Sequence, residues 1–148
     1  MNKQQTFNVG DVLYSESSHL DYVIESIVAN DIIAYRIRDG AANISKIYTI
    51  HNINSVINFI KNKEIVHHPV KEQMEYNIAI GDLLHEGMKN NFLLVTNISE
   101  LGGVATLQWY NRAQQRYEQT RYDMRIVNIW IKEQTVTLYR SNKENNEI

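Results

Sequence analysis

The chain has 148 residues, of which 43% are hydrophobic and 22% are charged, and its formal net charge is -2 at pH 7. This balance is typical of a globular protein and argues against a basic protein that coats nucleic acid. No apolar run approaches the roughly 20 residues that a helix needs to cross a bilayer, and no apolar signal-peptide segment follows the polar first six residues. The absence of cysteine excludes disulfides and thiolate chemistry. We therefore expect a cytoplasmic protein that does not engage a membrane.

The chain resembles itself when it is shifted by 71 residues without a gap. Apolar positions then fall on apolar positions at the start, middle and end of each copy, in the same order. The matching segments are residues 9–13 (VGDVL) with 80–84 (IGDLL), 22–27 (YVIESI) with 93–98 (LLVTNI), and 59–61 (FIK) with 130–132 (WIK). This pattern predicts a tandem duplication of one small domain.

A junction between the two copies is expected near residues 67–73. Pro69 lacks a backbone donor and restricts the residue before it, which suits a segment that leaves a sheet. The prediction is a first domain of residues 1–70, a second domain of residues 71–140 and a flexible polar tail of residues 141–148.

Strands dominate the first copy. Alternating apolar residues and β-branched residues predict strands over residues 7–14, 21–28, 32–38, 44–50 and 64–68. In the fourth strand this alternation places Ile44, Lys46, Tyr48 and Ile50 on one side. A turn or bulge is expected at Gly10-Asp11, and a turn at Asp39-Gly40.

A helix is predicted before the last strand of each copy. Ile53, Val56, Ile57 and Ile60 recur at the spacing of one helical face, and Asn52 can cap the helix. In the second copy the apolar positions are Met124, Val127 and Ile131, the cap is Asp123, and residues 135–140 are the closing strand. Because both the cap and the apolar face recur in register, the helix is the strongest support for the duplication.

This order of four strands, a short helix and a closing strand, given twice, resembles the SH3-like small barrel. The segments VGDVL and IGDLL also resemble the first strand of such barrels, including the Tudor-like and KOW-like ones. The resemblance implies a mainly β fold of two tandem SH3-like barrels. The predicted helix is longer than the single turn usual there. No set of aromatic residues matches a Tudor cage, so binding of methyl-lysine is not implied.

No pattern typical of catalysis is present. The adjacent His67 and His68 would point to opposite faces of a strand, and we interpret them as a solvated strand end. Asp11 and Asp82 each follow a glycine, and we interpret them as residues that cap a turn through backbone amides. Phosphate-binding glycine loops and nucleophile elbows are absent from the sequence. We therefore predict no enzymatic activity, no metal site and no cofactor.

The candidate binding residues lie between Gln108 and Arg125. This stretch combines aromatic rings, which can stack on bases, with arginines, which can pair with phosphate or carboxylate groups. At the same offset the first copy has only residues 38–41 (RDGA). The alternative interpretation is a solvent-facing hairpin whose rings are divided between core and cross-strand pairs. The candidates are Trp109, Tyr110, Arg112, Arg116, Tyr117, Arg121, Tyr122 and Arg125.

The favoured function is a non-catalytic binding module, either an adaptor or an inhibitor of a host system, whose partner is another protein. The abundance of Asn and Ile is typical of AT-rich genomes, which include those of many phages and mobile elements. The alternative is a binder of nucleic acid or of a nucleotide messenger through residues 108–125, and the low net charge favours a small ligand or a short segment. An enzyme would need groups from both copies to converge. Exposed strand edges favour a homodimer.

Overall fold

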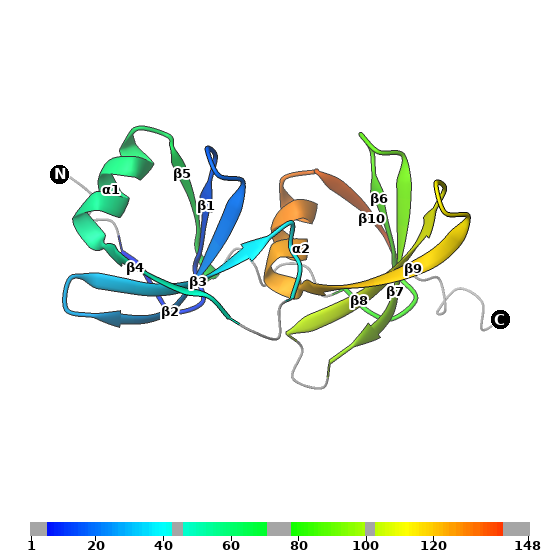
Figure 1. Ribbon diagram of the computed structural model, residues 1–148, viewed down its shortest axis with the longest axis horizontal. Helices are drawn as coiled ribbons and strands as arrows, with labels where there is room; N and C mark the ends of the chain where they lie inside the picture. Colours follow the sequence, from blue (N-terminus) through cyan, green and yellow to red (C-terminus); the bar gives the residue numbers. More distant parts are fainter. Residues whose placement is uncertain (1–5, 43–45, 71–77, 100–102, 141–148) are drawn as a thin grey trace. The chain divides into compact units, whose positions relative to one another are not determined.

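The computed structural model describes residues 6–42, 46–70, 78–99 and 103–140. The expected tail, residues 141–148, and most of the expected junction lie outside the described residues. The chain divides into two compact units, unit 1 with residues 1–74 and unit 2 with residues 75–148. Each unit contains a five-stranded antiparallel sheet and one helix, so the protein is mainly β (Figure 1).

Unit 1 follows the predicted order of elements. The elements are β1 (Val12–Ser15), β2 (Leu20–Val28), β3 (Asp31–Arg38), β4 (Tyr48–Asn52), α1 (Ile53–Lys61) and β5 (Ile65–His68). The strands are hydrogen-bonded in the order β4-β3-β2-β1-β5. The chain therefore forms a meander of four strands, and the last strand then pairs with the first.

Unit 2 repeats this topology. Its elements are β6 (Leu83–Glu86), β7 (Asn91–Ile98), β8 (Val104–Asn111), β9 (Arg116–Asp123), α2 (Met124–Lys132) and β10 (Val136–Tyr139). The strand order β10-β6-β7-β8-β9 is the order of unit 1 read from the other edge. The predicted succession of strands and helix is thus confirmed in both halves.

The sheets are not closed barrels, which corrects the expectation of barrels. In unit 1, β4 and β5 are the two edge strands, and α1 connects them (Figure 1). A helix of nine residues is about 13 Å long, whereas hydrogen-bonded strands lie only about 4.8 Å apart. The helix is therefore longer than the spacing of two paired strands, and its apolar residues Ile53, Ile57 and Ile60 pack against the core of the unit.

Both helices begin at the predicted caps. The Oδ1 atom of Asn52 accepts hydrogen bonds from the backbone N–H groups of Asn54, at 2.9 Å, and Ser55, at 3.4 Å. Asp123 Oδ1 accepts from the N–H of Arg125 at 2.9 Å. These bonds satisfy amides that have no partner inside the first helical turn, which explains why Asn and Asp stand there.

The Gly-Asp pair makes the same turn in each unit. Asp11 Oδ2 accepts from the N–H of Asn8, and Asp82 Oδ2 accepts from the N–H of Ala79, both at 2.9 Å. The glycine before each aspartate has a φ of 96°, a conformation that other residues adopt only with strain. The interpretation of both aspartates as turn caps is confirmed.

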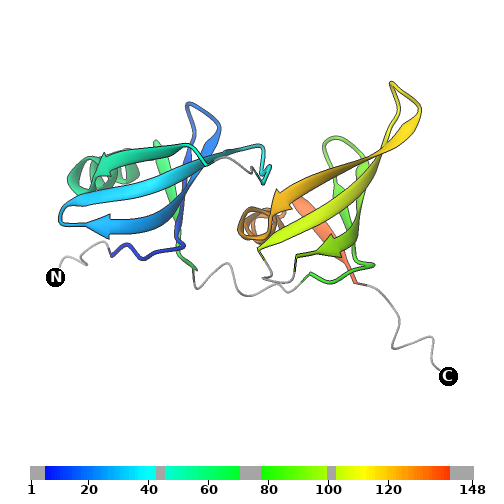
Figure 2. The same ribbon diagram turned by 60° about the horizontal axis from the view of Figure 1, so that its bottom comes forward.

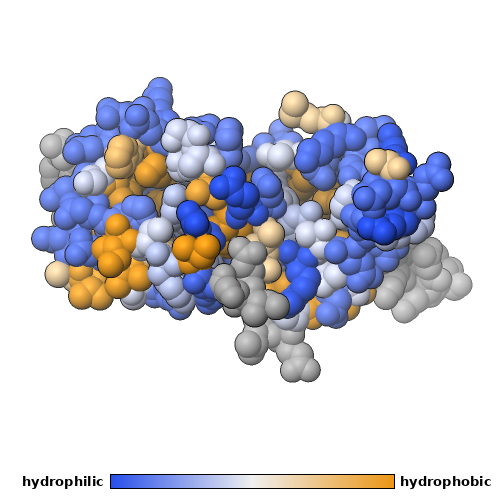
Figure 3. Space-filling view, viewed as in Figure 1, coloured by the Kyte–Doolittle hydropathy of each residue, from blue (hydrophilic) through white to orange (hydrophobic). Residues whose placement is uncertain are grey.

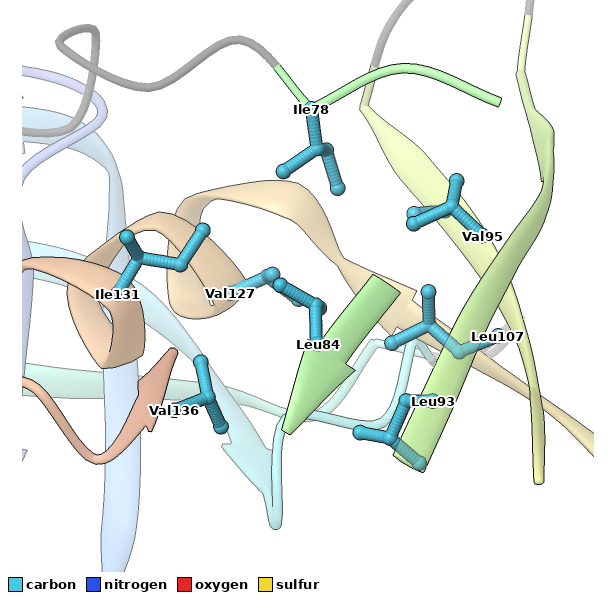
Figure 4. Packing of buried hydrophobic residues seen from close by; sticks show 9 residues of the cluster. Ile78, Leu84, Leu93, Val95, Leu107, Val127, Ile131 and Val136 are labelled. Carbon is cyan, nitrogen blue, oxygen red and sulfur yellow. The ribbon is translucent and has the colours of Figure 1, made fainter. Parts of the chain in front are cut away.

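Each unit has its own hydrophobic core. In unit 1 the buried core contains Phe7, inward residues of the sheet and Val56 of α1, and further apolar residues of the helix pack against it. In unit 2 side chains from β6, β7, β8, α2 and β10 converge in the same way (Figure 4). The apolar side of β4 faces solvent and not the core, since Ile50 is 70% exposed. On β4 the inward positions are the polar Thr49 and His51, which alternate with Tyr48 and Ile50.

The residues of the two units correspond at an offset of 71 positions except in the third strand, where the offset is larger. Ile24 pairs with Ala34, and Val95 pairs with Leu107, so Leu107 corresponds to Ala34, whereas a uniform offset of 71 residues would place it on Arg36. The connection from β7 to β8 is longer than that from β2 to β3, and this causes the shift. Trp109 and Tyr110 therefore correspond to Arg36 and Ile37, not to positions in residues 38–41.

Candidate binding site

The candidate residues lie on and around the hairpin of β8 and β9. The two strands pair over their whole length, from Val104 opposite Asp123 to Asn111 opposite Arg116. Asn111 Oδ1 accepts from the N–H of Gln114 at 3.2 Å and stabilises the turn. Figure 2 shows that the hairpin extends beyond the other strands of its sheet. Its side chains alternate between a face toward the core and an outer face.

The core side of the hairpin carries Trp109 and Tyr122. Both rings are partly buried and pack against the core of unit 2. Trp109 Nε1 donates to Thr120 Oγ1 at 3.1 Å, and the Tyr122 ring meets the Trp130 ring edge-on with 5.6 Å between centroids. These two rings mainly complete the core. The interpretation of the stretch as a solvent-facing hairpin expected this role for some of its aromatic residues.

The outer face carries Tyr110 and Tyr117. They are directly opposite each other on β8 and β9, and their rings meet edge-on at 5.1 Å. Tyr117 is 69% exposed and Tyr110 42%. Neither ring is needed to fill the core, so both are free to contact a partner.

The same face continues across the neighbouring strands. Phe92 on β7 is 51% exposed and stacks on His85 of β6, with 4.5 Å between centroids. Leu94 lies opposite both Leu83 and Gln108, and Leu83 lies opposite Tyr139 on β10. We call this surface the outer face of unit 2, and we define its apolar part as Leu83, His85, Phe92, Leu94, Tyr110, Tyr117 and Tyr139.

A shallow hollow of about 380 Å³ lies on this face. Phe92, Leu94, Tyr110 and Tyr117 are among the residues that line it, and Arg112 lies at its rim. Arg112 Nη2 donates to the backbone carbonyl of Asn90 at 3.4 Å, which places the guanidinium beside the turn between β6 and β7. The hollow therefore combines apolar walls with a cation.

The four arginines of the candidate stretch have different surroundings. Arg116 donates through Nε and Nη2 to Glu118 Oε1, at 3.2 and 3.1 Å. Arg125 lies on α2, with its Nε atom 3.5 Å from Asp123 Oδ1. Arg121 is exposed and lies opposite Thr106. Among the described residues neither Arg112 nor Arg121 has a carboxylate partner, so these two are available to an anion.

The structure thus brings Trp109, Tyr110, Arg112 and Tyr117 together around the hollow and places Arg121 further along the same strand pair. Arg116, Tyr122 and Arg125 are held in other contacts. Sequence reasoning missed Phe92 and Leu94. The available signal was a run of four apolar residues, 92–95, which makes β7 apolar on both of its faces.

The aromatic character of this face belongs to unit 2. By strand pairing, Phe92 corresponds to Asp21 and Tyr110 to Ile37, and by the 71-residue offset Tyr139 corresponds to His68. A second exposed apolar group lies on unit 1 and consists of Tyr48 and Ile50 on β4 and Ile47 just before that strand. Figure 3 shows hydrophobic surface on the lower part of unit 1. The group of Ile47, Tyr48 and Ile50 contains a single aromatic ring, that of Tyr48.

Among the residues that the structure describes, Tyr48 and His51 of unit 1 have pKa values shifted from their ordinary ones. A hydrogen bond to Glu25 raises the pKa of Tyr48, assisted by desolvation and by the charge of Glu25. Burial lowers the pKa of His51. Neither residue lies on the outer face of unit 2, where apolar contact, ring stacking and pairing with anions are the chemistry available.

The histidines of β5 correct one interpretation. His67 and His68 lie on a strand, as predicted, but the side chain of His67 is only 9% exposed and His68 is buried. A solvated strand end is therefore wrong for this pair. For His67 the reason is Asp11, whose buried carboxylate accepts a hydrogen bond from it. In the part of the chain that the structure describes, no group of three His, Cys, Asp or Glu side chains is placed to hold a metal ion.

Comparison of the chain with protein-family models, with curated proteins and with solved structures yields no match. Neither of the two helices in the described ranges has the length and apolar character needed to span a membrane.

Proposed function

We propose that this protein is a non-catalytic binding module and that it binds another protein through the outer face of unit 2. The observation that carries the proposal is the run of exposed aromatic and aliphatic side chains over β6, β7, β8 and β9. Large contiguous apolar patches on a protein surface mark sites of interaction. Tyr, Phe and Arg are also the residues that protein interfaces favour.

The charge on this face specifies the partner further. Arg112 and Arg121 have no carboxylate partner among the described residues, whereas Arg116 is already paired with Glu118. A complementary surface would place an apolar segment on the rings and acidic side chains beside the two arginines. Such rim charges mainly increase the association rate and the specificity.

For the fold we propose an open variant of the SH3-like small barrel, present twice. The element order and the helix between the fourth and fifth strands support it. The extra length of the helix accounts for the open sheet. In this view the helix covers the side of the unit where strand pairing would otherwise close the barrel.

A second candidate is the binding of a nucleotide or a short nucleic acid. It is favoured by the exposed ring of Tyr117 beside Tyr110 and by the guanidinium of Arg112 at the same hollow. A base could stack on the ring while the arginine pairs with a phosphate. This mode predicts affinity that falls steeply with salt concentration, whereas apolar burial against a protein predicts a weak salt dependence.

Affinity capture with the intact chain tests the proposal. We expect a stoichiometric protein partner on the wild type that is lost with Tyr117→Ala. Tyr48→Ala, a matched exposed tyrosine on unit 1, should retain the partner. Equal capture by both variants would place the interface elsewhere, and absence of any partner together with salt-sensitive binding of short oligonucleotides would favour the second candidate. Sedimentation of the same variants tests whether the partner is a second copy of this chain.

A further inference from the structure

Unit 1 has a cavity that is separate from the outer face of unit 2. It measures about 230 Å³ and is formed by α1, by the strands β1, β2, β4 and β5, and by residues near their ends. Its inner surface is apolar, with the buried Leu13 and Val56 among the lining residues. Figure 3 shows hydrophobic surface in a recess between α1 and the strands of this unit. The volume lies below the roughly 300–1,000 Å³ of ordinary ligand pockets, so only a small group fits.

His51 contributes a hydrogen-bond acceptor to this cavity. Its Nε2 atom lies 2.7 Å from Thr49 Oγ1, and the Thr49 hydroxyl donates to the carbonyl of Ala34 at 3.4 Å. In the tautomer in which the Thr49 hydroxyl donates to Ala34, the imidazole donates through Nε2 and keeps a lone pair on Nδ1. The Tyr22 ring meets His51 edge-on at 5.1 Å and fixes its orientation.

The polar groups of the cavity favour a cation. Among the described residues that line it, Glu64 is the only acidic one, and none is a lysine or an arginine. The hydroxyls of Ser15 and Ser17, 3.4 Å apart, add two further acceptors. Tyr22 and Phe59 present aromatic rings, which attract cations through their faces.

Unit 2 carries different residues at the corresponding positions. Tyr122 stands where unit 1 has His51, and Trp130 stands where it has Phe59. The two larger rings contact each other edge-on and pack against the core. Thr135 replaces Glu64, whereas Glu86 replaces Ser15, so the carboxylate stands at a different position in unit 2. Met88 replaces Ser17, so neither serine hydroxyl is present there. The acceptor set is therefore a property of unit 1.

We propose that this cavity binds a primary alkylammonium group, carried either by a lysine side chain or by a free amine. The alkyl chain contacts Leu13, Val56 and Ile65. The ammonium group donates hydrogen bonds toward Glu64, the serine hydroxyls and His51. A primary ammonium has three N–H donors for these acceptors, whereas a neutral alcohol of the same length has one and lacks the charge.

Titration of the isotope-labelled full chain by NMR tests this proposal. We expect n-butylammonium to shift the amide signals of residues 13–17, 49–56 and 64–65, and n-butanol to bind more weakly. Glu64→Gln should weaken n-butylammonium binding roughly three- to fivefold, as for an exposed ion pair. Glu16→Gln is the matched control, because Glu16 is a nearby exposed carboxylate outside the lining of this cavity, and it should leave the affinity unchanged. His51→Tyr, which introduces the residue of unit 2, should abolish binding while the spectrum remains that of a folded protein.

Three results would overturn the proposal: equal affinity for n-butanol, equal effects of Glu64→Gln and Glu16→Gln, or no shifts near the cavity. A lysine with blocked backbone ends distinguishes the two sources. Tighter binding of this probe than of n-butylammonium assigns the cavity to a lysine side chain, and weaker binding assigns it to a free amine. Tyr117→Ala should not change any of these titrations, so failure here and failure of the protein-binding function are separable.

Discussion

His67 Nε2 donates a hydrogen bond of 2.8 Å to Oδ2 of Asp11, whose side chain is completely buried. The same carboxylate accepts from the backbone N–H of Asn8 at 2.9 Å and, through Oδ1, from the N–H of Val70 at 2.8 Å. One side chain therefore joins the turn before β1 to β5 and to the residue that follows Pro69. In unit 2 the corresponding Asp82 accepts from Ala79 and lies 3.7 Å from Arg140 Nη1.

Replacing this carboxylate should destabilise unit 1 selectively. Asp11→Asn keeps the shape of the side chain but replaces one acceptor by an amide group that faces donors. We expect a loss of about 2 to 4 kcal/mol in the free energy of unfolding. Denaturation followed on the amide signals of each unit would measure it.

The matched control is Asp39→Asn. Asp39 is exposed and has a φ of 54°, a conformation that Asn tolerates, so its effect should stay within about 0.5 kcal/mol. If both variants lost the same stability, the hydrogen bonds of Asp11 would not be what holds β5 in place.

Acid should weaken unit 1 through His51. Burial lowers the pKa of His51 in the folded state, so the unfolded chain binds the proton first as the pH falls. The free energy of unfolding should therefore decrease as the pH drops below about 6.5, the ordinary histidine value. The decrease should end below the pKa of the folded state, and above about 6.5 the residue should contribute no pH dependence.

Acid acts on the whole chain, so the informative quantity is the difference between two variants. His51→Gln removes the titrating ring and keeps an N–H donor for Thr49. Subtracting its pH profile from that of the wild type should leave a contribution that falls with acid. A difference that is flat, or that rises toward low pH, would contradict the burial of a neutral imidazole.

Local signals in the sequence were sufficient for the turns and helix starts. Asn52, Asp123, Asp11 and Asp82 act on backbone amides two or three residues away, so the residue type and its spacing contain the information. Barrel closure is different, because it depends on whether strands distant in the chain meet across α1. The SH3-like resemblance could not decide this question.

The candidate site was predicted only in part, because the sequence alone does not show which side of each strand faces solvent. Alternation along β8 and β9 separates Tyr110 and Tyr117 from Trp109 and Tyr122, but a sequence does not say which parity faces solvent. Phe92 and Leu94 were overlooked because a strand that is apolar on both faces is typical of a buried strand. The insertion before β8 also moved Trp109 out of the gapless alignment, so its counterpart was misassigned.

Removing the helix caps should cost similar energies in the two units. Asn52→Ala and Asp123→Ala each leave amides of the first helical turn without a partner, and we expect a loss of about 1 kcal/mol for each. Asn52→Asp should be nearly neutral, because aspartate caps the equivalent helix of unit 2. Thermal unfolding followed by circular dichroism and by NMR would measure these effects. A loss from Asn52→Asp as large as that from Asn52→Ala would show that another contact of Asn52 is important.

The two faces of the β8–β9 hairpin should separate stability from binding. Tyr122→Ala removes a ring that packs against Trp130 and the core, and we expect a loss of about 2 to 4 kcal/mol in the stability of unit 2. Tyr117→Ala removes a ring that is 69% exposed, so the cost should remain within about 1 kcal/mol while partner capture is lost. Denaturant titration monitored by tryptophan fluorescence reports on unit 2, because Trp109 and Trp130 both lie there. If Tyr117→Ala destabilised unit 2 as much as Tyr122→Ala, the outer face would be structural, and loss of capture would no longer indicate an interface.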